Sequence, residues 1–398
     1  MSEVMGLFAV GFVIVYGLVS QFVFKRFRIP DALLLISFGV FLSFFHFTDV
    51  IKQGSNELSF LITFSLIYVI FYGALPIRLK AIFSTLKFAF FSAISNFVVI
   101  TGLVGVVAHL FGFSWVLSLS LGAIFSLLDG SIIHSLLETL KVSEKAEAQI
   151  HAESAILDCL VIVGVLSLIN FSSVGLNGFF SGVSSYLFLS VAVGALVGFL
   201  WVFVLRAVGD YTSAPIATMA VLSMLYAFSE YIKSNGVVAV FAFSIIISNA
   251  SSWSRLLSKE QQAKIAVLSS PSKSFFKELS FLIKTFLFVY LGILVDFNNW
   301  GYLLIGLLFF VVAYIVRASI SGFIYNKELK KKELYFLEAM CAKGLTAIVL
   351  LSIVKGGIGF TNIVIGGVLA SVVVSSILIF LVEKEKFNSF TEFIFNKL

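Results

Sequence analysis

GAIFSLLDGS, residues 122–131, interrupts a long apolar run of this chain with an acidic residue followed by glycine. The run covers 115–140, and a second run over 334–354 is interrupted in the same manner by CAKGLT, residues 341–346. Glycine weakens a helix because it loses the most conformational freedom when it becomes ordered, and a charge at membrane depth costs a few kcal/mol. Both runs are therefore predicted to be helices that break near their middle.

The rest of the sequence has the composition of a membrane protein. Of its 398 residues, 60% are hydrophobic and 12% are charged, compared with about 25% charged residues in ordinary soluble domains. Apolar runs of about 18 residues or more recur, as α-helical spans require, and a membrane β-barrel would show short alternating segments instead. We predict an all-α polytopic protein with about 13 transmembrane helices, at 4–23, 31–46, 58–75, 86–110, 115–140, 150–169, 183–205, 214–231, 236–250, 275–295, 301–324, 334–354 and 361–382.

Basic residues are distributed unevenly between the loops that join these spans. Loops after odd-numbered spans, counted together with the first residues of the span that follows and with the tail 383–398, hold 21 Lys and Arg residues, and loops after even-numbered spans hold 3. Cytoplasmic loops carry such an excess, so the amino terminus is predicted outside and the carboxyl terminus in the cytoplasm. The net charge of +6 is explained by these loops, and no nucleic-acid partner is expected.

The two broken spans occupy matching positions, at the centres of spans four to six and eleven to thirteen. Span twelve comes seven positions after span five, an odd step, so the two triplets cross the membrane in opposite directions. Inverted repeats with two crossing, interrupted helices near the midplane are the layout of many secondary transporters. The sequence therefore predicts this architecture.

Six charged residues lie at membrane depth in this segmentation, which favours a functional site. The alternative is that they form structural ion pairs or lie nearer to an interface. Asp129 and Lys343 stand at ends of half-helices, where each offsets a partial charge of the helix dipole. For Asp129, cation binding is an equally good interpretation. The six are Asp129, Glu153, Asp158, Lys284, Arg317 and Lys343.

The stretch HAESAILDC, residues 151–159, carries the predicted chemistry. On a helix, Ser154 and Asp158 share a face, and His151 lies on the same stripe about two turns from Asp158. A carboxylate with a hydroxyl and free carbonyls is a hard-oxygen site that suits Na⁺ or Li⁺. Burial favours the protonated form of a carboxyl group, so Asp158 can hold a proton when the cation leaves. One carboxylate that binds either ion is sufficient for cation/proton exchange.

Several motifs resemble, in order and spacing, those of the monovalent cation/proton antiporter superfamily, specifically its NhaP-like sodium/proton exchanger branch. They run along most of the chain. They are IP at 29–30 with Gly39, FYGAL at 71–75, LDG at 128–130, ESAILD at 153–158, FLFVYLG at 286–292, Arg317 and KGLT at 343–346.

The resemblance implies one membrane domain, 1–382, with a mobile core (86–169 and 301–382) and a scaffold that carries a homodimer interface (1–75 and 183–295). It implies alternating access in the plasma membrane, with lipid, a monovalent cation and a proton as partners and no cofactor besides the transported Na⁺, Li⁺ and H⁺. The implied cation ligands are Asp158, Ser154, Glu153 through water, Asp129 and the backbone carbonyl of Leu128.

This sequence departs from the family pattern at several of these positions. Leu157 replaces an Asn of the exchangers and a second Asp of their electrogenic relatives, which predicts electroneutral exchange. Leu128 replaces a Thr and Gly130 a Pro, and His151 stands where an acidic residue is common. Lys284 is expected to pair with Asp158 or Glu153, to reach an interface, or to be neutral. Its role is expected to be either that of a structural ion pair or that of a proton carrier. Glu153 is expected to be held by Arg317 or Lys284.

Other functions are compatible with some of these features. A K⁺/H⁺ antiporter or K⁺ efflux protein is the first alternative, although no G-x-G-x-x-G fingerprint of a nucleotide-binding domain follows the last span. A transporter-like protein that has lost transport is the second. A membrane-embedded hydrolase is a remote third, because Ser131 and His134 lie at depth without an H-E-x-x-H or G-x-S-x-G motif. We therefore expect a transporter and not an enzyme.

Overall fold

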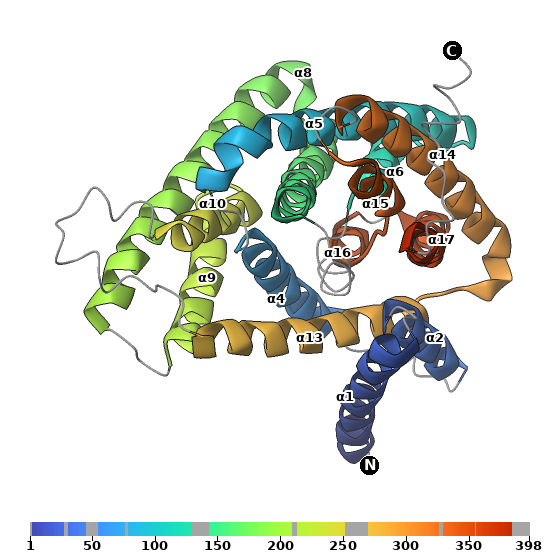
Figure 1. The fold of residues 1–398 in the computed structure, drawn as a ribbon, viewed down its shortest axis with the longest axis horizontal. Coiled ribbons are helices and arrows are strands. Elements are labelled where there is room, and N and C mark those ends of the chain that lie inside the picture. The colour runs from blue at the N-terminus through green and yellow to red at the C-terminus, as the bar shows by residue number, and fades with distance from the viewer. Residues whose placement is uncertain are drawn as a thin grey trace. The chain divides into compact units, whose positions relative to one another are not determined.

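The fold is known from a computed structural model, which describes residues 2–27, 31–44, 55–75, 79–128, 143–208, 213–250, 270–325, 329–354 and 356–383 (Figure 1). Within these ranges the regular structure is helical throughout, so the predicted all-α fold is confirmed. The helices are α1 (Ser2–Phe27), α2 (Asp31–Ser43), α4 (Ser55–Ala74), α5 (Leu79–Leu110), α6 (Trp115–Ser126), α8 (Glu144–Val208), α9 (Ala214–Tyr231), α10 (Gly236–Ser248), α13 (Ser270–Ile293), the 3₁₀ turn η2 (Phe297–Asn299), α14 (Trp300–Tyr325), α15 (Lys331–Ala339), α16 (Leu345–Ile353) and α17 (Gly357–Glu383).

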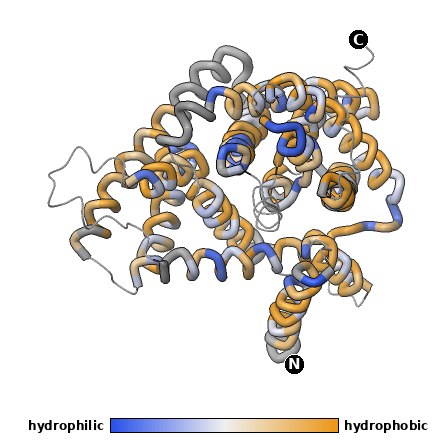
Figure 2. The backbone as a smooth tube through the Cα atoms, viewed as in Figure 1, coloured by the Kyte–Doolittle hydropathy of each residue, from blue (hydrophilic) through white to orange (hydrophobic). Residues whose placement is uncertain are grey.

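Nearly all of these helices consist mainly of hydrophobic residues (Figure 2). Five described stretches are both long enough and apolar enough to cross a membrane, which agrees with the predicted multi-pass protein. Shorter apolar helices occur in addition, and the total of thirteen spans stays a prediction. The five stretches are Lys87–Leu110, Lys145–Ile169, Phe188–Leu205, Phe297–Tyr325 and Gly357–Val382.

The chain divides into two compact units. The first unit contains Met1–Ile62, Val98–Lys141 and Phe281–Leu398, and the second contains Thr63–Phe97 and Val142–Ser280. In the first, α14 packs along α17 and α1 along α2; in the second, α10 packs along α8 and α9. These bounds differ from those of the predicted core and scaffold, which concern movement during transport and stay a prediction.

Helix α8 differs from the predicted segmentation. Two spans, 150–169 and 183–205, were expected with a loop between them, and the structure has one continuous helix of 65 residues. The connecting residues 170–182 contain three glycines but no proline, so every backbone N–H there can take part in a helix. A helix of this length is about 100 Å long, against roughly 30 Å of hydrocarbon. Its apolar stretches nevertheless lie where the two spans were expected.

The predicted break in 334–354 is confirmed. Helix α15 ends at Ala339, residues 340–344 are not helical, and α16 begins at Leu345. In 115–140, helix α6 ends at Ser126, and Leu127 and Leu128 are not helical. Asp129 and the rest of that segment lie outside the described residues.

Helices α2 and α13 touch backbone to backbone at Gly39 and Gly292. A Cβ atom at Gly39 would lie 2.1 Å from the carbonyl oxygen of Val289, and one at Gly292 would lie 2.2 Å from that of Ile36. Only glycine allows an approach of this kind. Eight residues before each glycine stand Asp31 and Lys284, which also contact each other. The two helices therefore run parallel and in register.

Candidate functional site

The first part of α8 carries three of the predicted site residues. Glu153 is 0% exposed and Ser154 is buried, while Asp158 is half-buried with its Oδ1 atom inaccessible to solvent. The Leu157 side chain beside them is fully buried. A carboxylate at this depth is costly unless it has polar partners, so the surroundings of each acid decide what it can do.

Glu153 is held by helix α5 of the same unit. Ser92 Oγ and Asn96 Nδ2 donate hydrogen bonds to Glu153 Oε1, at 2.9 and 3.2 Å, and Asn96 Nδ2 also donates to Ser92 Oγ. All three side chains are fully buried. The sequence analysis missed Ser92 and Asn96. The expected contact of Glu153 with Arg317 stays a prediction.

The side chains of Glu153 and Asp158 project from different faces of α8. Five residues of helix separate them, which corresponds to a rotation of about 140° and a rise of about 7.5 Å. Ser154 lies only about 40° from Asp158 in projection, one turn away. Within α8, Ser154 is therefore the better placed of the two to share a cation with Asp158, and ligation through Glu153 and a water molecule stays a prediction.

Polar residues continue the Asp158 face toward the start of α8. His151 lies three residues before Ser154, and Glu147 lies four residues before His151. These spacings keep both residues on the helix face of Ser154 and Asp158. His151 Nε2 lies 3.9 Å from Glu147 Oε1, and the Glu147 side chain is 46% exposed. The stripe thus leads from a half-buried carboxylate to an accessible one. The sequence analysis identified His151 on it and missed Glu147.

Lys343 of the first unit joins the two broken segments. Its side chain is buried, and Nζ donates a hydrogen bond to the carbonyl oxygen of Leu127, 3.0 Å away. Leu127 directly follows α6 and caps its carboxyl end. The carboxyl end of a helix carries a partial negative charge, so the ammonium group compensates the end of α6. The sequence analysis expected Lys343 to compensate the end of its own half-helix, and the structure places its ammonium group at the end of the other broken helix. Leu128, the predicted carbonyl ligand, is the next residue and is fully buried.

Arg317 of α14 contacts the same unwound segment. It is 3% exposed, and its Nε donates to the carbonyl oxygen of Met340 at 3.1 Å. Met340 directly follows α15. Arg317 therefore supplies a hydrogen bond to a backbone carbonyl that leaves the helical pattern.

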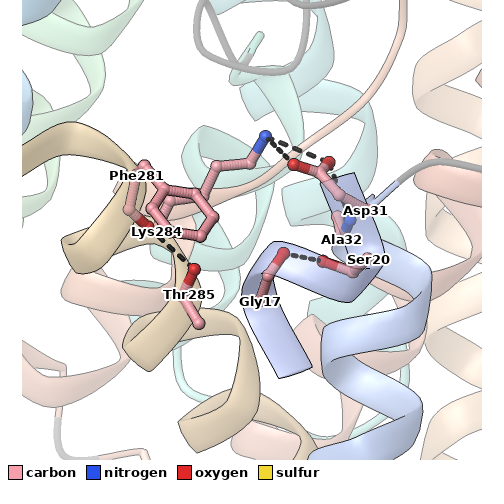
Figure 3. A network of polar contacts seen from close by, with 7 residues as sticks. All are labelled: Gly17, Ser20, Asp31, Ala32, Phe281, Lys284 and Thr285. Carbon is pink, nitrogen blue, oxygen red and sulfur yellow. Dashed lines mark hydrogen bonds and ion pairs between the residues drawn. The ribbon is translucent and has the colours of Figure 1, made fainter. Parts of the chain in front are cut away.

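Lys284 of α13 pairs with Asp31 at the start of α2 (Figure 3). Its Nζ lies 2.9 Å from Asp31 Oδ2 and 3.1 Å from Oδ1, and both residues are 8% exposed. Asp31 Oδ1 also accepts from the backbone N–H of Ala32. Lys284 thus forms a structural ion pair, one of the roles expected for it, with a partner that the sequence analysis did not identify.

Comparison with known protein families and curated proteins gives matches to one kind of protein. The family described as sodium/hydrogen exchanger, transmembrane, matches residues 5–384. An uncharacterized Na⁺/H⁺ antiporter of Schizosaccharomyces pombe is 26% identical over 206 residues, which are 47% of this chain and 34% of the yeast protein. The chain thus spans about a third of the length of that relative.

Two of the solved structures with a similar fold are of an archaeal protein. The sodium proton antiporter MjNhaP1 of Methanocaldococcus jannaschii at pH 8 matches with a TM-score of 0.78 and 16% identity, over 97% of this chain and 98% of that one. A map of the same antiporter from electron microscopy matches with a TM-score of 0.73 over the same shares. At this identity the likeness shows the fold alone.

Proposed function

The chain belongs to the sodium/hydrogen exchanger family, and from that premise we propose that it is a secondary-active antiporter that exchanges Na⁺ or Li⁺ for H⁺. The observation that carries the proposal is the half-buried Asp158 on an apolar stretch of α8, with the Ser154 hydroxyl one turn away. Its relatives are transporters and not enzymes, so the membrane-embedded hydrolase is dropped.

Asp158 binds the cation and the proton in turn. A carboxylate competes with water for Na⁺ or Li⁺ because it offers a full negative charge and hard oxygen atoms. When the cation leaves, an ionised carboxyl group at membrane depth is unfavourable, and a proton neutralises it. The Asp158 carboxylate is therefore neutralised in both loaded states, which permits alternating access without moving its bare charge through the bilayer.

The remaining predicted residues assist this exchange in our proposal. Ser154 supplies a neutral oxygen ligand, and Glu153, Asp129 and the Leu128 carbonyl complete the ligand set that the family resemblance implies. Lys343 and Arg317 stabilise backbone that leaves the helical pattern. We further propose a homodimer in the plasma membrane, with the amino terminus outside, on the basis of the resemblance and of the uneven distribution of basic residues.

Purified protein in liposomes that contain a pH-sensitive dye tests the function. With an imposed proton gradient, external Na⁺ or Li⁺ is expected to release dye quenching, because each cation that enters removes a proton. K⁺ at the same concentration is expected to have a much smaller effect. A response to K⁺ alone would assign K⁺/H⁺ exchange, and no response to any of the three ions would contradict antiport.

Ser154→Ala is expected to raise the apparent KM for Na⁺ about fivefold, because one neutral ligand is lost and a hydrogen-bond-sized interaction is worth about 1 kcal/mol. The maximal rate is expected to stay near that of the unmodified protein, since Asp158 is intact. Ser167→Ala, which removes a hydroxyl from the same helix farther along, is the matched control. An inactive Ser154→Ala variant would contradict a simple ligand role.

Exchange is expected to be electroneutral and therefore insensitive to membrane potential. Leu157 stands in place of the second carboxylate, and Lys284 Nζ donates to both carboxylate oxygens of Asp31. Initial rates of Na⁺-driven proton movement are measured with a K⁺ diffusion potential set by valinomycin. Equal rates at zero and imposed potentials agree with one H⁺ per Na⁺. A rate that follows the potential, and ceases to do so in Lys284→Gln, would identify Lys284 as a second proton carrier.

A further inference from the structure

The unwound residues 340–344 between α15 and α16 contain backbone groups, such as the N–H of Lys343, that have no backbone partner in either helix. At membrane depth such groups need partners inside the protein, because lipid offers none and each unsatisfied group costs several kcal/mol. Residues 340–343 are 4% exposed or less. The partners of this backbone therefore determine where the segment lies.

Two serines of α17 supply those partners. The backbone N–H of Lys343 donates to Ser371 Oγ and that of Cys341 donates to Ser375 Oγ, both at 2.9 Å. Ser375 Oγ in turn donates to the carbonyl oxygen of Ala339 at 2.7 Å, where α15 ends. The two serines are four residues apart, so they share one face of α17. Both are fully or almost fully buried.

These contacts continue to the other broken helix. Ser371 holds the backbone of Lys343, and the ammonium group of the same residue holds the Leu127 carbonyl at the end of α6. Arg317 fixes the carbonyl of Met340. Helix α17 is thus linked to the end of α6 by two consecutive hydrogen bonds, with the unwound segment between them.

We propose that Ser371 and Ser375 are positioning residues of the exchanger, which hold the unwound segment so that the Lys343 ammonium group stays on the Leu127 carbonyl. The inference rests on the proposed function, in which the neighbouring Leu128 carbonyl is a cation ligand. Neither serine touches the cation. They act through the backbone of the segment and through Lys343.

A hydroxyl in a membrane helix most often bonds a carbonyl of its own helix. Ser376 of α17 does this, with Val372 as its acceptor. Ser371 also donates to its own helix, at Val368, but in addition it accepts from Lys343. The Ser376→Ala variant is therefore a matched control, because it removes a hydroxyl from the same helix at a residue that does not contact the unwound segment.

Transport kinetics give the first test. Ser371→Ala and Ser375→Ala are each expected to raise the apparent KM for Na⁺ about fivefold, the equivalent of one hydrogen bond, with a maximal rate within about twofold of the unmodified protein. Ser376→Ala is expected to leave both unchanged. Ser371→Ala is expected to add nothing further in a Lys343→Met background, because residues that act through one another are not additive.

Labelling of Cys341 gives a second test that does not depend on transport. This thiol is 1% exposed and its Sγ lies 3.2 Å from Ser375 Oγ. Loss of either serine is expected to raise its rate of reaction with a membrane-permeant maleimide about fivefold, since local opening becomes easier by the same hydrogen bond. Peptide mapping separates Cys341 from Cys159, the other cysteine.

The outcomes separate the inference from the function. If Ser371→Ala and Ser375→Ala match Ser376→Ala in KM, the positioning role is overturned. Additive effects of Ser371→Ala and Lys343→Met would overturn it as well. If the unmodified protein transports no cation, the proposed function fails, and the labelling rates alone decide: equal rates in all three serine variants overturn the inference, and faster labelling in the first two supports it.

Discussion

Replacement of Asp158 by Asn is expected to reduce Na⁺-driven proton movement to the level of liposomes without protein. Asparagine has nearly the same volume, but its amide cannot release a proton for a cation. It also lacks the charge that makes binding of a dehydrated cation favourable. Ser154 and the neighbouring hydroxyls cannot replace it, because a neutral ligand carries no titratable proton at physiological pH. The loss is therefore expected to be complete and independent of the Na⁺ concentration.

The same variant is expected to remain folded. Removal of a half-buried charge at membrane depth does not destabilise by itself, since desolvation of the ion is avoided. Thermal unfolding in detergent, followed by tryptophan fluorescence, is expected to give a Tm at or above that of the unmodified protein. Asp296→Asn, the same chemical change in the turn after α13, is the control for transport. Exchange by Asp158→Asn at a rate close to that of Asp296→Asn would refute the assignment.

Lys284→Met is expected to destabilise the protein by about 3–5 kcal/mol, because it leaves the Asp31 carboxylate buried without its ammonium partner. The pair is bidentate and both side chains are about one-tenth exposed, so solvent cannot take the place of the lysine. The double variant Asp31→Leu/Lys284→Met is expected to regain most of the loss, since apolar residues often replace a buried ion pair at little cost. Figure 3 shows the two side chains that the double variant removes together.

Chemical unfolding in detergent measures these differences as free energies. Lys277→Met removes an exposed lysine from the same helix, and a change within about 0.5 kcal/mol is expected for it. A single Lys284→Met variant as stable as Lys277→Met would show that the ion pair contributes nothing. A double variant as unstable as the single one would show that packing, and not the unpaired charge, is responsible.

Features of the fold that depend on residues close together in the sequence were predicted well. The break in 334–354 followed from one charge and one glycine in an apolar run, and it lies where the structure places it. The face shared by Ser154 and Asp158 followed from helical spacing alone. The two α8 spans were correctly located, but the expected loop between them is helical, because glycines without a proline do not oblige a helix to end.

Contacts between distant parts of the sequence were not predictable in the same way. Asp31 stands 253 residues from Lys284 and follows Pro30, so it was taken as the start of a span and not as a partner. Ser92 and Asn96 hold Glu153 from another helix, and Ser371 and Ser375 hold the unwound backbone. Serine and asparagine leave no periodic signal in an apolar helix, so only the folded structure distinguishes them from ordinary span residues.

The parallel pairing of α2 and α13 sets a rule of parity for the chain between them. Asp31 meets Lys284 and Gly39 meets Gly292, so the two helices, both predicted spans, point in the same direction. A chain that leaves one crossing and returns to make another in the same direction must cross an odd number of times in between. The predicted spans give seven. If α8 crossed only once, six crossings would lie between α2 and α13, and the two helices would be antiparallel. The Gly39–Gly292 contact therefore agrees with the prediction that α8 contributes two of these spans.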